Sequence, residues 1–164
     1  MENLVGNLDA RIQQVMDTSV EEERKINSLR ENKDNLLSQQ AQKIEEVALK
    51  LLPLMHTIKD MGYKFHVKDI NYVSRRGPII GFKDYEDELF VFDVANQFPC
   101  VIKVGERDQP SNSVNYHGLL KEFKFTQIMD NLLSVLDHYQ DIQESYQEMI
   151  TKLQTDLNKY ENVL

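Results

Sequence analysis

A group of basic residues near the middle of the chain carries the clearest signal of chemistry. It comprises Lys64, His66, Lys68, Tyr72, Arg75 and Arg76. The first three alternate, so an extended strand would place them on one face, and the two arginines would follow in the adjoining turn. Cations beside an aromatic ring can hold phosphate or single-stranded nucleic acid. The simpler interpretation is that long cationic side chains protect an exposed sheet face or edge, and a third is that they meet an acidic protein surface.

The remaining residues that commonly do chemistry are scattered. The four histidines, His56, His66, His117 and His138, are not spaced as zinc ligands are. The only cysteine, Cys100, follows a proline in an apolar run, where we expect a small buried hydrophobe rather than a nucleophile. We therefore expect no catalytic residue, no metal and no cofactor.

An acidic group lies between two apolar runs, at Asp84, Glu86, Asp87 and Glu88. It lacks the spacing and the glycine of a calcium-binding loop, which favours a solvated turn. It also remains available as an acidic docking patch. Upstream, the segment 77–81 has glycines but no lysine and no following helix, so it indicates a hairpin turn and not a phosphate-binding loop.

The elements that position these residues are dominated by a long apolar stripe at the C-terminal end. Its members are Phe125, Ile128, Leu132, Val135, Tyr139, Ile142, Tyr146, Met149, Leu153 and Tyr160. Positions three and four apart share one helix face, so the spacing predicts a helix over 119–164 that buries one side against another helix. The alternative is a helix that begins near Thr126 after a short strand at residues 123–125. The tyrosine hydroxyls need partners when buried, which favours antiparallel or multi-helix packing over a parallel zipper.

The N-terminal part has a similar pattern. A first seam runs Ile12, Val15, Ile26, Leu29 and Leu36, and a second, displaced by one residue, begins at Leu37 and ends at Ile58. Ser19 and Glu22 form a capping-box pattern, so we expect a main helix over 19–62 and a short helix or arm over 1–18.

Between the two helical regions, apolar and β-branched runs predict four antiparallel strands. We place them at residues 65–73, 79–82, 88–94 and 98–104, within a β region over 63–105, with a polar loop over 106–118. In the third run both faces are apolar, which predicts a strand covered on both sides. The expected fold is α+β, with a small four-stranded antiparallel sheet inserted between long helices that pack as an antiparallel coiled coil or multi-helix stalk.

Composition limits the function. The chain has 164 residues, 41% of them hydrophobic and 28% charged, and a net charge of −8, with more acid than base in both helical regions. This charge disfavours non-specific nucleic-acid binding. A lone cysteine and the lack of a long apolar run favour the cytoplasm and no membrane association.

We expect a non-enzymatic protein–protein interaction module, such as an adaptor, assembly factor, chaperone or inhibitor. We expect it to form a homo-oligomer, most simply a dimer, and to bind another protein. The alternative is a nucleic-acid-binding accessory protein that uses the basic group.

Overall fold

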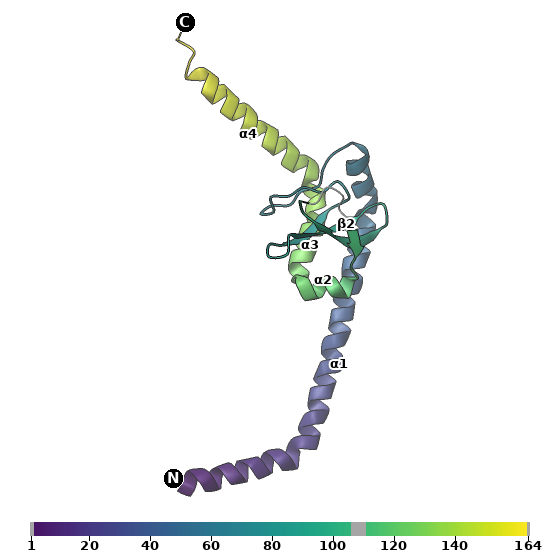
Figure 1. The fold of residues 1–164 in the computed structure, drawn as a ribbon, viewed down its shortest axis with the longest axis vertical. Helices are drawn as coiled ribbons and strands as arrows, with labels where there is room; N and C mark the ends of the chain where they lie inside the picture. The colour runs from purple at the N-terminus through teal and green to yellow at the C-terminus, as the bar shows by residue number, and fades with distance from the viewer. Residues whose placement is uncertain (1, 106–110, 164) are drawn as a thin grey trace. The chain divides into compact units, whose positions relative to one another are not determined.

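The structure is a computed structural model that describes residues 2–105 and 111–163, with side chains from residue 6 and, after the gap, from residue 112. The chain divides into two compact units, Met1–Gln40 and Ala41–Leu164, which we call unit 1 and unit 2. The fold is mixed α+β, as the sequence predicts, with long helical segments flanking a four-stranded antiparallel sheet (Figure 1). Within the described residues, no helix is long and apolar enough to cross a membrane.

The first helix, α1, runs from Glu2 to Asp60. It does not begin near Ser19, where the capping-box pattern had placed the start of the main helix. Instead, the Ser19 hydroxyl donates to the Met16 carbonyl at 2.8 Å, and the Thr18 hydroxyl donates to the Gln14 carbonyl at 3.0 Å. Hydroxyls inside a helix commonly bond to the preceding turn in this way. The helix ends before Gly62, whose φ of 82° suits a residue without a Cβ.

The sheet is an antiparallel meander of β1 (Ile79–Lys83), β2 (Glu88–Asp93), β3 (Phe98–Lys103) and β4 (Ser111–Ser113), in that spatial order. The prediction is confirmed for the three runs that became β1, β2 and β3. It is wrong for the first run, residues 65–73, which forms no strand. The fourth strand comes instead from the segment predicted to be a polar loop, of which residues 106–110 lie outside the described residues.

The first run fails as a strand because its chain turns back on itself. Phe65 and Ser74 form a single antiparallel bridge, with N–O distances of 2.7 and 2.9 Å. Between them Asp69 adopts a φ of 71°, which interrupts an extended strand. The segment 64–77 is therefore a loop, and Lys64, His66 and Lys68 do not share the face of a strand.

The sheet is covered on both sides, as the apolar faces of β2 predict. One side packs the even-numbered Phe90 and Phe92 against α1, α2 (Tyr116–Glu122) and α3 (Phe125–Leu133). That core takes Ile44, Met55 and Ile58 from α1. The opposite face of β2, Leu89 and Val91, packs under the 64–77 loop in a second cluster with Val67, Ile79, Cys100 and Ile102. The cover of this second face is a loop, and not a further helix.

The C-terminal part is not one helix. It contains α2, α3, the 3₁₀ turn η1 (Ser134–Asp137) and α4 (His138–Asn158). Phe123 and Lys124 are extended, with ψ of 155° and 142°, and separate α2 from α3. This bend lets Leu119 of α2 and Ile128 of α3 both enter the core fully buried. The Asn131 amide of α3 also donates to the Ile80 carbonyl of β1 at 2.6 Å, which holds α3 to the sheet.

Candidate functional site

The 64–77 loop brings most of the predicted basic group together. Lys64, Tyr72, Arg75 and Arg76 line one cavity of about 300 Å³, whereas His66 lines a neighbouring one. Lys68 lines neither of these cavities. The alternation that suggested a common face thus misplaces Lys68 and His66. The structure still places three cations and a tyrosine around one hollow.

This loop is held in place by its own backbone. The bridge between Phe65 and Ser74 closes it, and the buried Ser74 hydroxyl accepts hydrogen bonds from the backbone N–H groups of Arg76 and Gly77 at 3.2 and 3.3 Å. A Cβ at Gly77 would collide with the Phe92 carbonyl oxygen, so the close approach to β2 requires glycine. Arg75 and Arg76 therefore project from a fixed turn.

The floor of the cavity is apolar. It is formed by Leu89, Ile102 and Val104, which reach it from the sheet and its edge. Tyr72 packs against Phe82, with ring centroids 4.8 Å apart. We call this surface, lined by Lys64, Tyr72–Arg76, Leu89, Ile102 and Val104, the basic groove.

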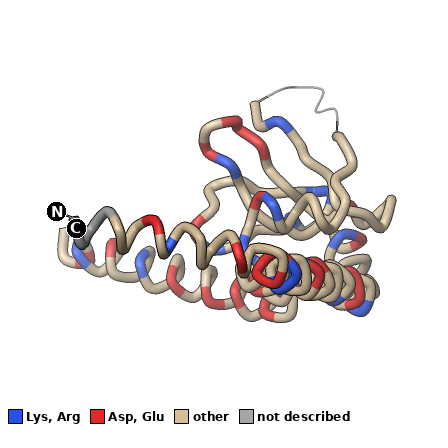
Figure 2. The backbone as a smooth tube through the Cα atoms, turned by 90° about the horizontal axis from the view of Figure 1, so that it is seen from below, with Lys and Arg blue, Asp and Glu red and all other residues tan. Residues whose placement is uncertain are grey.

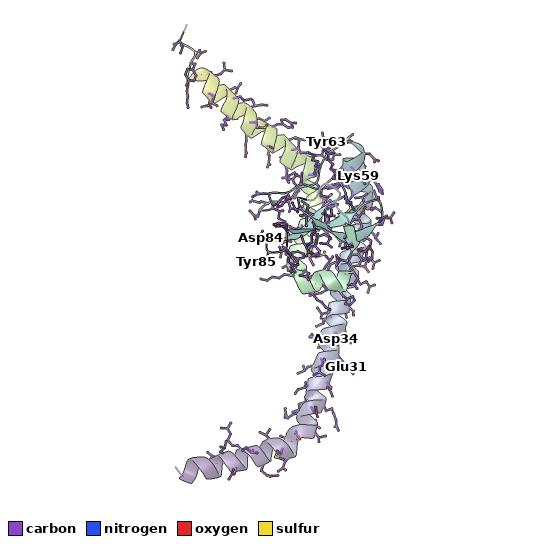
Figure 3. All side chains as sticks on the ribbon, in the orientation of Figure 1. Glu31, Asp34, Lys59, Tyr63, Asp84 and Tyr85 are labelled. Carbon is purple, nitrogen blue, oxygen red and sulfur yellow. The ribbon has the colours of Figure 1, made fainter. Side chains whose placement is uncertain are left out.

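Two further hollows adjoin the basic groove, because Lys64 lines all three. One, of about 390 Å³, also includes Lys59, Tyr63 and Arg75. The other, of about 450 Å³, extends to Ile142, Tyr146 and Met149 on α4. Figure 3 labels Lys59 and Tyr63, which lie near each other where α1 ends.

The predicted C-terminal seam separates into a buried and an exposed part. Ile128, Leu132 and Val135 are buried in the core of unit 2, and Phe125 is half-buried against it. Ile142 is half-buried, and Tyr139 lies at the boundary between the buried and the exposed part of the seam. Beyond them the seam is open to solvent, at Tyr146, Met149, Leu153 and Tyr160. Its first part is thus the ordinary core of unit 2, and only α4 and the following turn present a free apolar face.

His138 lies at the junction of η1 and α4, in an aromatic environment. Its ring centroid is 5.6 Å from that of Tyr63, 5.5 Å from Tyr139 and 5.8 Å from His66. The side chain is buried, and its Nε2 has no hydrogen-bond partner among the described residues. Burial, and then the charge of His66, lower its pKa, which Asp141 partly opposes.

Cys100 is a buried hydrophobe, as its sequence context predicts. Burial raises the pKa of its thiol to about 11, Asp93 adds to this, and Arg76 acts in the opposite direction. A thiol with so high a pKa is a poor nucleophile at neutral pH. In the described part of the chain, no three His, Cys, Asp or Glu side chains gather as metal ligands would.

Comparison with known proteins gives no relative. No family model, curated protein or solved structure matches this chain. The geometry of the two units therefore has to carry any functional argument.

Sequence reasoning missed two parts of this site. It placed the basic residues on a strand, and so missed the hollow that forms when the loop folds over Leu89 and Ile102. It also treated His138 as an ordinary histidine, although the ring lies among Tyr63, Phe65 and Tyr139. The neighbouring Tyr139 was a visible signal, but Tyr63 and Phe65 are distant in sequence.

Proposed function

We propose that this chain is a non-enzymatic protein–protein interaction module that self-associates through its helices. The proposal rests on the solvent exposure of the α1 side chains in unit 1. Every described side chain from Gly6 to Gln39 is exposed, yet this stretch bears apolar residues at three-four spacing, interrupted by Ser19, Glu22 and Lys33. The seam is Ile12, Val15, Ile26, Leu29 and Leu36. Adaptor, assembly factor, chaperone and inhibitor are the roles open to such a module.

The energetics favour a partner for this seam. Ile26 is 51% exposed and Leu29 is 67% exposed. Fully burying a side chain of this size contributes about 1.5–3 kcal/mol. Most helical stability in proteins comes from packing an amphipathic face, and a single helix in water gains none of it. The repeated three-four spacing is that of helix-to-helix packing.

Unit 1 carries both acidic and basic residues, and some of them form ion pairs. Figure 2 shows acidic and basic positions interspersed along the helices. Ion pairs with spacing i,i+3 join Arg24 to Glu21 at 3.3 Å and Lys25 to Glu22 at 3.6 Å. Glu31 and Asp34, labelled in Figure 3, are also exposed on this stretch. Such exposed pairs add little stability, so the apolar seam is the source of binding energy.

The exposed face of α4 supplies a second surface for the same purpose. Tyr146 is 61% exposed and Leu153 is 64% exposed. The aromatic side chains suit uneven packing against an antiparallel or multi-helix partner better than a parallel two-stranded zipper. We propose a homo-oligomer, a dimer in its simplest form, that also binds another protein in a reducing cytoplasm, where a lone cysteine stays reduced.

Sedimentation velocity tests the proposal on the full chain. The wild-type protein is expected to sediment as a dimer or larger species at micromolar concentration. The double variant Ile26→Asp/Leu29→Asp places two charges in the seam, and is expected to weaken association by at least about tenfold.

A matched control adds the same charge off the seam. Ser28→Asp/Asn32→Asp also changes two exposed residues of α1 and is expected to leave association unchanged. A wild-type monomer throughout the concentration range would overturn self-association, as would equal loss in both double variants.

A further inference from the structure

The three hollows around Lys64 form a continuous surface with two kinds of lining. The basic groove and the hollow beside Tyr63 share both Lys64 and Arg75. The third hollow continues from Lys64 and Val73 to the apolar side chains at the start of α4. All of these residues belong to unit 2. A ligand that crosses this surface therefore meets cationic side chains at the centre and apolar side chains on two sides.

The described lining around Lys64 and Arg75 is cationic and apolar. Among the residues that the structure describes, no Asp or Glu lines the basic groove or the hollow beside Tyr63. Among the described residues, Lys59, Lys64 and Arg75 form no ion pair, whereas Lys83 has two carboxylate partners, Glu86 and Glu122. Lys64 and Arg75 are exposed, so their charge is presented to solvent. This surface favours an anionic ligand.

The apolar part of the lining determines which class of anion fits this surface. Leu89 and Ile102 are almost fully buried and Val104 is half-buried, so together they form a small apolar lining that an aliphatic side chain can contact but that offers no partner to a phosphate. A peptide with acidic residues flanked by large apolar residues matches both kinds of lining.

We infer that the basic groove is a docking site for an acidic peptide segment of a partner protein, whose carboxylates pair with Lys64 and Arg75 while an apolar side chain enters over Leu89 and Ile102. This inference rests on the proposed interaction function and names the chemistry of its partner. The loop needs little rearrangement, because the Phe65–Ser74 bridge and the Ser74 hydroxyl already fix its shape.

Selection from a library of random peptides tests the inference without assuming a sequence. The full chain is the bait, and enriched peptides are expected to combine Asp or Glu with Leu, Ile, Phe or Tyr. A fluorescein-labelled copy of the most enriched peptide is then titrated with protein. Lys64→Glu/Arg75→Glu is expected to weaken its binding by at least about tenfold, and added salt should weaken wild-type binding.

The control reverses two exposed charges elsewhere. Arg11→Glu/Lys50→Glu changes the net charge equally and is expected to leave peptide affinity unchanged. The inference is overturned if no peptide is enriched, if enriched peptides carry no acidic excess, or if the groove variant binds them as well as wild type. Binding of a short single-stranded DNA that is lost in the groove variant would also overturn it, in favour of nucleic acid.

Sedimentation of the groove variant separates this inference from the proposed function. Retained self-association with lost peptide binding is the expected result. If the wild-type chain binds acidic peptides through the groove but remains a monomer, then the self-association proposal fails and the docking site stands.

Discussion

His138 shows how one residue can couple the stability of unit 2 to pH. Its side chain is only 4% exposed, and aromatic rings and His66 surround it instead of hydrogen-bond acceptors. Burial, followed by the charge of His66, lowers its pKa below the ordinary value, while Asp141 raises it by a smaller amount. In the unfolded chain the same histidine would titrate near its usual pKa of about 6.5.

We expect the free energy of unfolding to fall as pH drops below about 6.5 and into the window between the unfolded and folded pKa values of His138. In this window the unfolded chain binds more protons than the folded one, so acid favours unfolding. One such group gives a slope of at most about 1.4 kcal/mol per pH unit. Urea unfolding between pH 7.5 and about 5.5, above the range where carboxylates titrate, measures it.

His138→Phe keeps an aromatic ring in the same cluster but cannot titrate, and is expected to flatten that slope. His56→Phe removes an exposed histidine of α1 and should leave the slope as it is. An equal slope in wild type and His138→Phe would show that another group is responsible.

The helices and strands show what the sequence pattern can and cannot predict. The strands β1, β2 and β3 follow from apolar and β-branched runs with polar turns between them, and the double cover of β2 follows from its two apolar faces. The break at Phe123 and Lys124 has no glycine or proline to mark it, because it is driven by packing of Leu119 and Ile128 into one core. The three-four spacing begins only at Phe125, just after that break, so it gives no information on a break before it.

The residue types identify the basic group, but the extended strand that the sequence suggested for it places its side chains wrongly. Alternation of Lys64, His66 and Lys68 predicts a common face only in an extended strand. The positive φ of Asp69 and the Phe65–Ser74 bridge are tertiary outcomes that put Lys64 beside Arg75 instead. Contacts between distant segments, such as Tyr63 with His138, have no local signature at all.

Helix α2 offers a test of how a short element is held. It has seven residues, and its N-cap Asn115 accepts a hydrogen bond from the Gly118 N–H at 2.6 Å. Asn115→Ala is expected to lower the free energy of unfolding by about 1 kcal/mol, because a donor of the first turn loses its partner. Urea unfolding of the full chain measures the loss.

Asn115→Asp retains an acceptor and should stay within about 0.5 kcal/mol of wild type. Asn112→Ala removes an exposed asparagine of β4 as a positional control. Equal stability of Asn115→Ala and wild type would show that Tyr116 and Leu119 hold α2 by burial alone.

At the scale of the whole molecule, the two units differ in what stabilises them. Unit 2 has a core on each face of its sheet, with Ile44, Phe92 and Ile128 fully buried. The described side chains of unit 1 are exposed almost without exception, and none enters a core. The sequence shows that its seam is apolar. It cannot show whether the partner of that seam is the same chain or another, because both satisfy the same periodicity.

Hydrogen–deuterium exchange at two protein concentrations, about a hundredfold apart, distinguishes these cases. We expect amides of residues 6–40 to be exchanged rapidly at the lower concentration and protected at the higher one, whereas amides of residues 44–58 stay protected at both. The reason is mass action: a partner present at about 100 times its Kd stabilises the bound helix by about 2.7 kcal/mol, and a separate helix in water is marginal.

The variant Ile26→Asp/Leu29→Asp should lose the concentration dependence in residues 6–40 and keep the protection of residues 44–58, while Ser28→Asp/Asn32→Asp should behave as wild type. If residues 6–40 of the seam variant are strongly protected at both concentrations, then the chain itself stabilises this helix. That result would contradict the proposal that the seam pairs between molecules.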